Sequence, residues 1–185
     1  MKKDIRFAIC LVVIFLLAIL CVYKLLAEKE SEAENNTGGY ELTVIPTPRT
    51  IVDPVDGKER TVIEFYKINL RKMDTVSAET AIEGGTEITP NLICDCVCEA
   101  LEDEELKIVV RKTSISKGVC TVDLDEEIKS VSESDPQVEK LILDAFSMSI
   151  LDNCKDIEAV SFTIMGEEYS TKNIKIESDK TYIKR

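Results

Sequence analysis

The clearest pattern in the chain is a near-unbroken apolar run from Phe7 to Leu26, which carries a single charge, Lys24, near its far end. At about 1.5 Å per residue, a helix of this length spans roughly the 30 Å hydrocarbon core of a bilayer. The run therefore predicts one transmembrane helix over residues 7–26.

The charges on either side of this run predict its orientation. Lys2, Lys3 and Arg6 precede it, and four glutamates follow within residues 28–34. Basic residues stay on the cytoplasmic side of a membrane span. We therefore expect a single-pass cell-membrane protein in which residues 1–6 are cytoplasmic, residues 7–26 are a signal anchor and the remainder is extracytoplasmic.

Two other interpretations of the N-terminus compete with this one. A cleaved signal peptide has a shorter apolar core that ends in small residues, whereas this run is longer and has large side chains throughout. A lipoprotein signal would attach lipid at Cys21, but such signals have a small residue before the cysteine, where this chain has Leu20. We favour the uncleaved helix and leave lipidation of Cys21 open.

Residues 27–59 have the composition of a flexible linker. The segment is acidic and polar, and Pro46, Pro48, Pro54 and Gly57 interrupt its second half. Chains of this kind behave as extended, partly stiff tethers. The sequence thus predicts that a domain beginning near residue 60 is held close to the membrane.

From residue 60 to about residue 170 the pattern changes to alternating strands and helices. The β-branched and aromatic run Thr61–Ile68 predicts a strand, and a polar stretch containing Gly84-Gly85 follows it. Thr89-Pro90 has the form of an N-cap followed by proline, which predicts a helix through about Glu102. On that helix Cys94, Val97, Cys98 and Leu101 are spaced to face a core, which leaves Asp95 and Glu99 outside.

The second half of this region predicts a hairpin, a helix and a closing strand. Leu106–Arg111 and Val119–Leu124 are expected to form the hairpin around a turn at residues 116–118. A helix should start at Ser134 or Asp135 and run to about Asn153, and Ile157–Met165 should be a strand. Residues 171–185 are expected to be a tail or an edge strand near 174–176. The predicted fold class is α+β, with one small mixed sheet and two helices packed on one face in the order β-α-β-β-α-β.

The charge of the chain limits its partners. The 185 residues have a net charge of −12, and residues 28–185 alone contain 19 Lys and Arg against 34 Asp and Glu. A strongly acidic surface repels nucleic acid and anionic lipid headgroups. We therefore expect no nucleic-acid partner, and we interpret the acidity as the surface of a soluble exported domain.

Catalytic patterns are weak. The chain has no histidine, which excludes Ser-His-Asp triads, Cys-His dyads and HExxH zinc sites. The segment Ser114–Lys117 matches S-x-x-K, but it straddles a predicted turn and lacks the partner motifs of that chemistry. Acidic pairs such as Glu104 and Glu105, or Asp123 and Asp125, have no predicted pocket to shift their pKa values. We therefore expect that the protein is not an enzyme, and we assign no catalytic or cofactor-binding residue.

Five of the seven cysteines lie in the predicted domain. Cys94, Cys96 and Cys98 alternate along one predicted helix, so their side chains do not converge on a metal ion, and Cys120 and Cys154 are distant in sequence. We interpret them as buried thiols, with one disulfide bridge involving Cys120 or Cys154 as the alternative. Asp123–Glu127 lacks the glycine and distal glutamate of a calcium loop. No metal is expected.

Three blocks of the domain resemble a known family. The segments GVCTVDLDEEI, VEKLILDAFSMSILDN and IEAVSFTIMGEEY are similar to the second half of a GerMN domain, the module of sporulation and spore-germination proteins. The family pattern G-x-x-x-V-D-L followed by a later turn glycine is occupied here by Gly118, Val122, Asp123, Leu124 and Gly166. TVIEFYKINL resembles the family's first strand. Leu101–Glu104 stands where the family often has Gly-Pro, and the likeness covers about Thr61 to Tyr169.

The resemblance implies an exported, tethered envelope protein of a Gram-positive bacterium. Members of the family have a fold similar to ring-building domains, whose helices and sheet edges pack against neighbouring copies, and some help build a channel complex between two cells. We therefore interpret the chain as a membrane-anchored binding or assembly module of the cell envelope. A cell-wall or ligand-binding module that contacts peptidoglycan is the alternative, and an envelope hydrolase ranks third.

Overall fold

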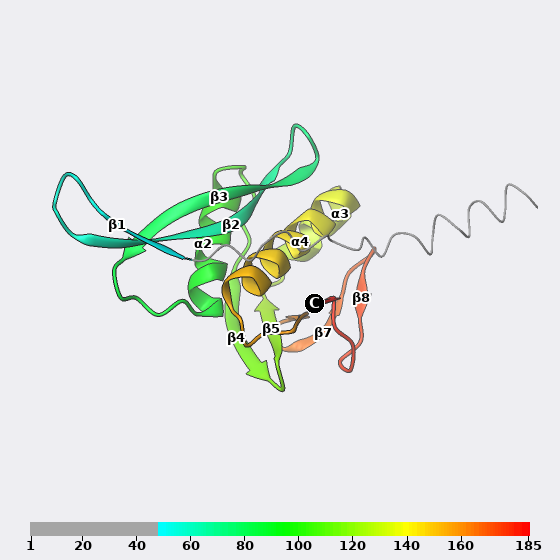
Figure 1. Ribbon diagram of the computed structural model, residues 1–185. Helices are drawn as coiled ribbons and strands as arrows, with labels where there is room; N and C mark the ends of the chain where they lie inside the picture. Colours follow the sequence, from blue (N-terminus) through cyan, green and yellow to red (C-terminus); the bar gives the residue numbers. More distant parts are fainter. Residues whose placement is uncertain (1–47) are drawn as a thin grey trace, which may run out of the picture. The chain divides into compact units, whose positions relative to one another are not determined.

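The computed structural model describes residues 48–185, which form an α+β unit. This part of the chain contains three helices and nine strands arranged in two sheets (Figure 1). The prediction of one sheet with two helices is therefore wrong in number, although the α+β class is confirmed. In chain order the elements are β1 Arg49–Val52, β2 Glu59–Asn69, β3 Asp74–Glu83, α2 Pro90–Glu102, β4 Val110–Ser116, β5 Val119–Leu124, α3 Glu127–Ser134, α4 Pro136–Asn153, β6 Ala159–Ile164, β7 Glu167–Ser170, β8 Lys175–Ile176 and β9 Ile183–Lys184.

The first sheet is antiparallel, in the order β1-β2-β3. The strand β1 lies within residues 27–59, the range predicted as a linker, because the β-branched side chains of Thr50, Ile51 and Val52 pair with residues 59–61 of β2. A turn after Val52 makes this pairing possible: the Asp53 carboxylate accepts a hydrogen bond from the backbone N–H of Val55 at 2.8 Å.

The strand β3 replaces the polar stretch that the sequence predicts after the first strand. Its half-buried residues Val76, Ala78, Thr80 and Ile82 alternate with exposed residues, which is the pattern of a strand with one covered face. The short side chains and the acidic residues between them lower the apparent hydrophobicity of the segment. Pairing with β2 along its full length, for example Phe65 opposite Ala78, fixes it as a strand.

The second sheet has the order β4-β5-β6-β7-β8, with β9 paired to β6. The strands β5 and β6 are parallel, and the other pairs are antiparallel, so the predicted mixed sheet is confirmed for this sheet. Parallel neighbours need a crossover connection, which α3 and α4 supply. The inward residues of β6 are as predicted: Val160, Phe162 and Ile164 are buried.

The two predicted helices begin where the sequence places them. Thr89 caps α2, its hydroxyl accepting from the N–H of Leu92 at 3.3 Å, and Asp135 caps α4 by accepting from Gln137 at 2.9 Å. The helix α3 is not predicted, because Glu126 and Glu127 resemble a polar connection. Ile128, which is 1% exposed, anchors it to the core.

The helix α4 joins the two sheets. It contacts β2 of the first sheet and β6 of the second, and Figure 1 shows it running between the sheets. Beyond the short strand β1, side chains of α4 occupy the edge of β2: Ser149 Oγ accepts from the N–H of Tyr66 at 2.8 Å, and Asn153 donates to the carbonyl of Glu64 at 2.7 Å. These bonds satisfy backbone groups that no strand reaches.

The predicted cytoplasmic segment, anchor and most of the linker lie outside the described residues. Within residues 48–185, no helix has the length and apolar character needed to cross a bilayer.

Candidate functional site

The most deeply buried carboxylate, Glu139 of α4, has a structural environment. It is 0% exposed and accepts hydrogen bonds from Tyr169 Oη at 2.8 Å and Thr171 Oγ1 at 2.6 Å. Asn173 Nδ2 lies 3.3 Å from its second oxygen and also donates to the carbonyl of Ser132 at 2.7 Å. Burial, followed by the Glu139 contact, raises the pKa of the Tyr169 hydroxyl. This cluster connects α3, α4 and the segment after β7.

Asp123, one of the predicted acid-base candidates, also has a structural role. It is 2% exposed, and one of its oxygens accepts from Thr163 Oγ1 at 2.8 Å and from the N–H of Gly166 at 2.7 Å. Arg111 contacts the other oxygen at 3.2 Å. Asp125 instead accepts from the N–H of Glu126, so the structure does not join Asp123 and Asp125 into a pair.

A third polar group lies where α4 meets β2. Tyr66 Oη donates to Asp152 at 2.9 Å. Burial raises the pKa of Tyr66 to about 12, and the hydrogen bond to Asp152 adds to that rise. Burial also raises the pKa of Asp152, although the Tyr66 hydroxyl and the Arg185 charge oppose it. The hydrogen bond between Tyr66 and Asp152 connects α4 to β2 of the first sheet.

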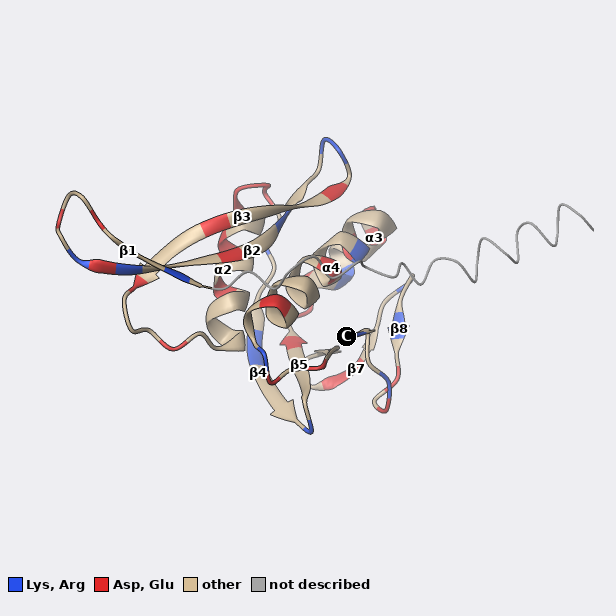
Figure 2. Ribbon diagram, in the orientation of Figure 1, with Lys and Arg blue, Asp and Glu red and all other residues tan. Residues whose placement is uncertain are grey.

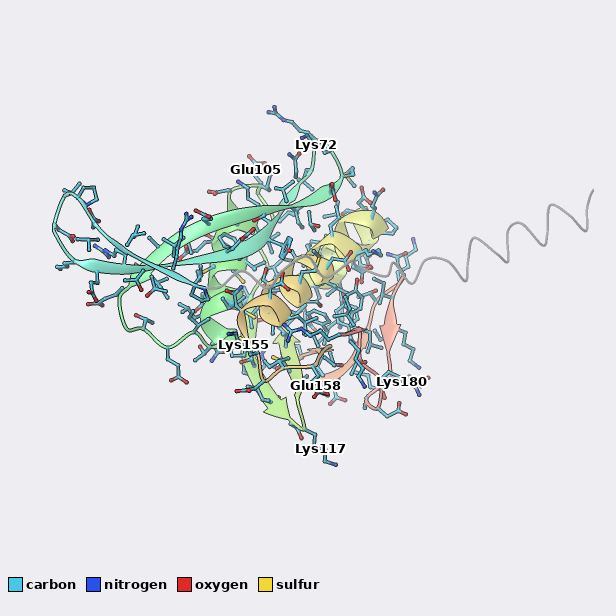
Figure 3. All side chains as sticks on the ribbon, in the orientation of Figure 1. Lys72, Glu105, Lys117, Lys155, Glu158 and Lys180 are labelled. Carbon is cyan, nitrogen blue, oxygen red and sulfur yellow. The ribbon has the colours of Figure 1, made fainter. Side chains whose placement is uncertain are left out.

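The remaining catalytic candidates are separated or exposed. Glu104 and Glu105 occupy the turn after α2, and Figure 3 shows Glu105 at the surface. Ser114 lies on β4, whereas Lys117 lies in the β4–β5 turn, at the tip of the hairpin in Figure 3. The S-x-x-K match therefore falls across a hairpin, as the sequence predicts, and not at a helix start.

All five cysteines in the described region are free thiols. Cys94, Cys96 and Cys120 are buried, and Cys98 and Cys154 are half-buried. Burial raises the pKa of Cys120 to about 12 and is the largest cause of a pKa of about 11 at Cys98 and Cys154. No set of three or more Cys, Asp or Glu side chains in residues 48–185 has metal-binding geometry.

Two shallow hollows mark the surface. A mainly apolar groove of about 350 Å³ lies between α3, the start of α4 and the turn after α2, with Leu106, Val131 and Val138 in its wall. A polar hollow of about 330 Å³ lies between the first sheet and α2, and its lining includes Lys67, Glu79, Glu99 and Asp103. Neither hollow contains the buried carboxylates described above.

Exposed apolar side chains and open strand edges are the features that remain for binding. In the β1–β2 hairpin, Ile51, Val52 and Val55 are 41%, 63% and 93% exposed. On the second sheet Ile115 of β4 is 58% exposed, and β4 is also the terminal strand of that sheet. Exposed apolar groups on a terminal strand are typical of contact surfaces.

Sequence reasoning assigned no residue to these exposed features, although part of the signal was present. The alternation of Val76, Ala78, Thr80 and Ile82 could have revealed β3. The placement of β4 was also wrong: the predicted strand Leu106–Arg111 overlaps it only at its first residues, since the strand runs on to Ser116. Which strands are terminal depends on pairing between distant segments, and local patterns do not contain that information.

The described fold is thus an α+β domain of two sheets joined by a long helix. No family model matches the chain. No curated protein matches it either. Among solved structures, it is similar to the tandem GerMN domains of the sporulation protein GerM from Bacillus subtilis, with 14% sequence identity and a TM-score of 0.46. The match covers 73% of this chain and 48% of that structure, so the chain spans about half its length. That structure consists of GerMN domains, the family that the sequence of this chain resembles.

Proposed function

We propose that this chain is a membrane-anchored module that acts outside the cytoplasm by binding, as an assembly or accessory factor of a bacterial cell envelope. The anchor and its orientation are supported by the apolar run at residues 7–26 and its basic N-terminal flank. The link to sporulation or spore germination rests on the resemblance to GerMN domains.

One structural contrast favours binding over catalysis. The buried carboxylates Glu139 and Asp123 are occupied by hydrogen bonds that connect secondary-structure elements, whereas the exposed features are strand edges and apolar side chains. Catalytic acids and bases usually lie in clefts with access to a substrate. These exposed features therefore support a function in binding another molecule.

Membrane topology tests the proposal. The full chain with a C-terminal epitope tag is produced in bacteria, and intact protoplasts are treated with protease. We expect the tag to fractionate with membranes and to be lost on treatment, while a cytoplasmic marker protein stays intact. Recovery of the full-length chain in the cytosol, or protection of the tag in intact protoplasts, would contradict the proposal.

A wall-binding or ligand-binding module is the second candidate, because the apolar groove at Leu106, Val131 and Val138 is large enough for a small group. Co-sedimentation of the purified chain with peptidoglycan would favour this candidate over assembly. Turnover of wall fragments by the same preparation would instead require an enzyme.

A further inference from the structure

Exposed apolar side chains gather at the turn that joins β1 to β2. Within residues 48–185 six large apolar side chains are exposed, and three of them, Ile51, Val52 and Val55, lie within five positions of one another. All four residues of β1 are exposed, and the strand pairs with β2 alone. In Figure 1 the turn projects from the body of the unit, away from α4. Apolar side chains grouped in this way are typical of a contact surface.

The backbone of this turn is bonded internally. The N–H of Asp53 donates to the carbonyl of Lys58 at 2.8 Å, and the N–H of Gly57 donates to the carbonyl of Asp53 at 2.8 Å. The Asp53 carboxylate accepts from the N–H of Val55 at 2.8 Å. The Asp56 carboxylate accepts from the N–H of Lys58 at 3.0 Å. Leaving water is costly for a backbone N–H without a partner, and these four N–H groups avoid that cost.

The hairpin is also the electrically balanced part of an acidic unit. Residues 48–60 contain three Lys and Arg and three Asp and Glu, whereas residues 61–185 contain 15 Lys and Arg against 26 Asp and Glu. Figure 2 shows both signs of charge on the hairpin. Arg60 lies 3.0 Å from the carboxylate of Asp56 and 3.8 Å from that of Asp53, so both carboxylates of the turn have a basic neighbour. The excess negative charge that repels lipid headgroups from the rest of the unit is therefore absent here.

The hairpin is the part of the unit that follows the predicted linker directly. The strand β1 begins at Arg49, and Val55 is six residues further along the chain, at most about 22 Å away. The predicted anchor ends at residue 26, and a linker with the length of residues 27–47 has an expected end-to-end distance of about 25 Å. The turn is therefore within reach of the bilayer that would hold the anchor.

We propose that the turn between β1 and β2 docks on the lipid bilayer that holds the N-terminal anchor, with Ile51, Val52 and Val55 at the level of the lipid headgroups. The inference rests on the anchor proposed above and goes beyond it, because it assigns a second membrane contact to the domain itself. Transfer of exposed apolar side chains from water into this interface is favourable. The linker makes docking intramolecular, so a contact that is weak on its own suffices. The contact gives the tethered domain one orientation relative to the membrane surface.

Tryptophan fluorescence in lipid nanodiscs tests the inference, because the chain has no tryptophan of its own. The full chain is reconstituted as Val55→Trp into nanodiscs of phosphatidylcholine, and into nanodiscs whose phosphatidylcholine carries bromine on its acyl chains. Bromine quenches tryptophan on close approach. We expect blue-shifted emission in the first nanodiscs and a loss of emission in the second. Ile115→Trp is the matched control, since it adds the same reporter at an exposed apolar residue of β4, and its emission should be equal in both.

A charged variant separates docking by the native side chains from insertion driven by the added indole. The full chain with Ile51→Trp as the reporter is compared with the same chain that also carries Val55→Asp. Val55 is 93% exposed, so the substitution leaves the folded unit intact, and thermal unfolding measures this. We expect Val55→Asp to lower the ratio of docked to undocked chains roughly tenfold, seen as a loss of most of the bromine quenching, because it removes one apolar contact and adds a charge.

Two kinds of result would overturn the docking of the hairpin. Equal quenching of Val55→Trp and Ile115→Trp, or quenching of neither, would show that lipid does not contact this turn selectively. A blue shift of Val55→Trp without bromine quenching would show that protein, such as a second copy, covers the turn instead. A chain that elutes with nanodiscs without being quenched would overturn docking alone, whereas a chain that does not elute with nanodiscs would overturn both the docking and the proposed anchor.

Discussion

Glu139 shows how a carboxylate can be fully buried without a basic partner. It accepts hydrogen bonds from the Tyr169 hydroxyl of β7 and from Thr171 and Asn173, which belong to the segment after β7. Hydrogen bonds to a charged acceptor are stronger than those between neutral groups. Glu139 therefore helps to hold the C-terminal segment to α4, together with Asp144, which accepts a hydrogen bond from Tyr182 Oη at 2.7 Å.

Removal of that side chain should be costly. We expect Glu139→Ala to lower the free energy of unfolding by about 3 kcal/mol, because it leaves a cavity and several buried donors unpaired. Chemical denaturation followed by circular dichroism measures the loss. Glu158→Ala, at an exposed site, should change it by less than about 0.5 kcal/mol. Equal effects of the two substitutions would show that the Glu139 cluster does not hold the segment.

Asp152 predicts a pH dependence. Its pKa is raised by burial, so the folded protein binds a proton at a pH where the unfolded chain has released it. The ionised carboxylate therefore costs stability above its folded pKa, and this cost disappears below the ordinary aspartate pKa. Asp152→Asn should gain stability relative to wild type near pH 7 and lose that gain near pH 3. Denaturation at the two pH values measures it, and a gain that is larger in acid would contradict the assignment.

At the scale of elements, caps and amphipathic faces were readable from the sequence, and pairing was not. The starts of α2 and α4 follow from Thr89-Pro90 and Asp135-Pro136, because a cap acts on its own helix. In contrast, the division into two sheets depends on long-range contacts. The strand β2 pairs with β3, and Ser149 and Asn153 of α4 bond to the part of the other β2 edge that β1 does not reach. The candidate binding edges follow from that choice, which is why the sequence left the binding face unassigned.

The cap of α4 is a test at this scale. Asp135 accepts from two backbone N–H groups at the first turn, at 2.9 Å and 3.4 Å. Asp135→Ala should cost about 1 kcal/mol of stability, whereas Asp135→Asn keeps an acceptor and should cost much less. Thermal unfolding of both variants decides between a capping role and a general effect of the lost charge, which would lower both alike.

For the molecule as a whole, charge is segregated along the chain. The acidic stretch covers β3 and α2, and the basic stretch covers β4 (Figure 2). If opposite charges contribute to self-association, salt should weaken it, because exposed charges are screened over about 3 Å at 1 M ionic strength. We expect the apparent dissociation constant in sedimentation experiments to rise between 0.05 and 0.5 M salt, by roughly tenfold. Tighter association at high salt would indicate a contact dominated by the apolar side chains at β1.

Cross-linking on intact protoplasts tests the central claim, that this domain binds copies of itself outside the membrane. Cells that produce the tagged full chain are treated with an amine-reactive cross-linker that cannot cross a bilayer, and the tag is detected after denaturing electrophoresis. We predict dimers and larger species with the wild-type chain in this experiment. A chain that remains monomeric, or that is cross-linked only by a membrane-permeant reagent, would contradict an extracytoplasmic assembly module.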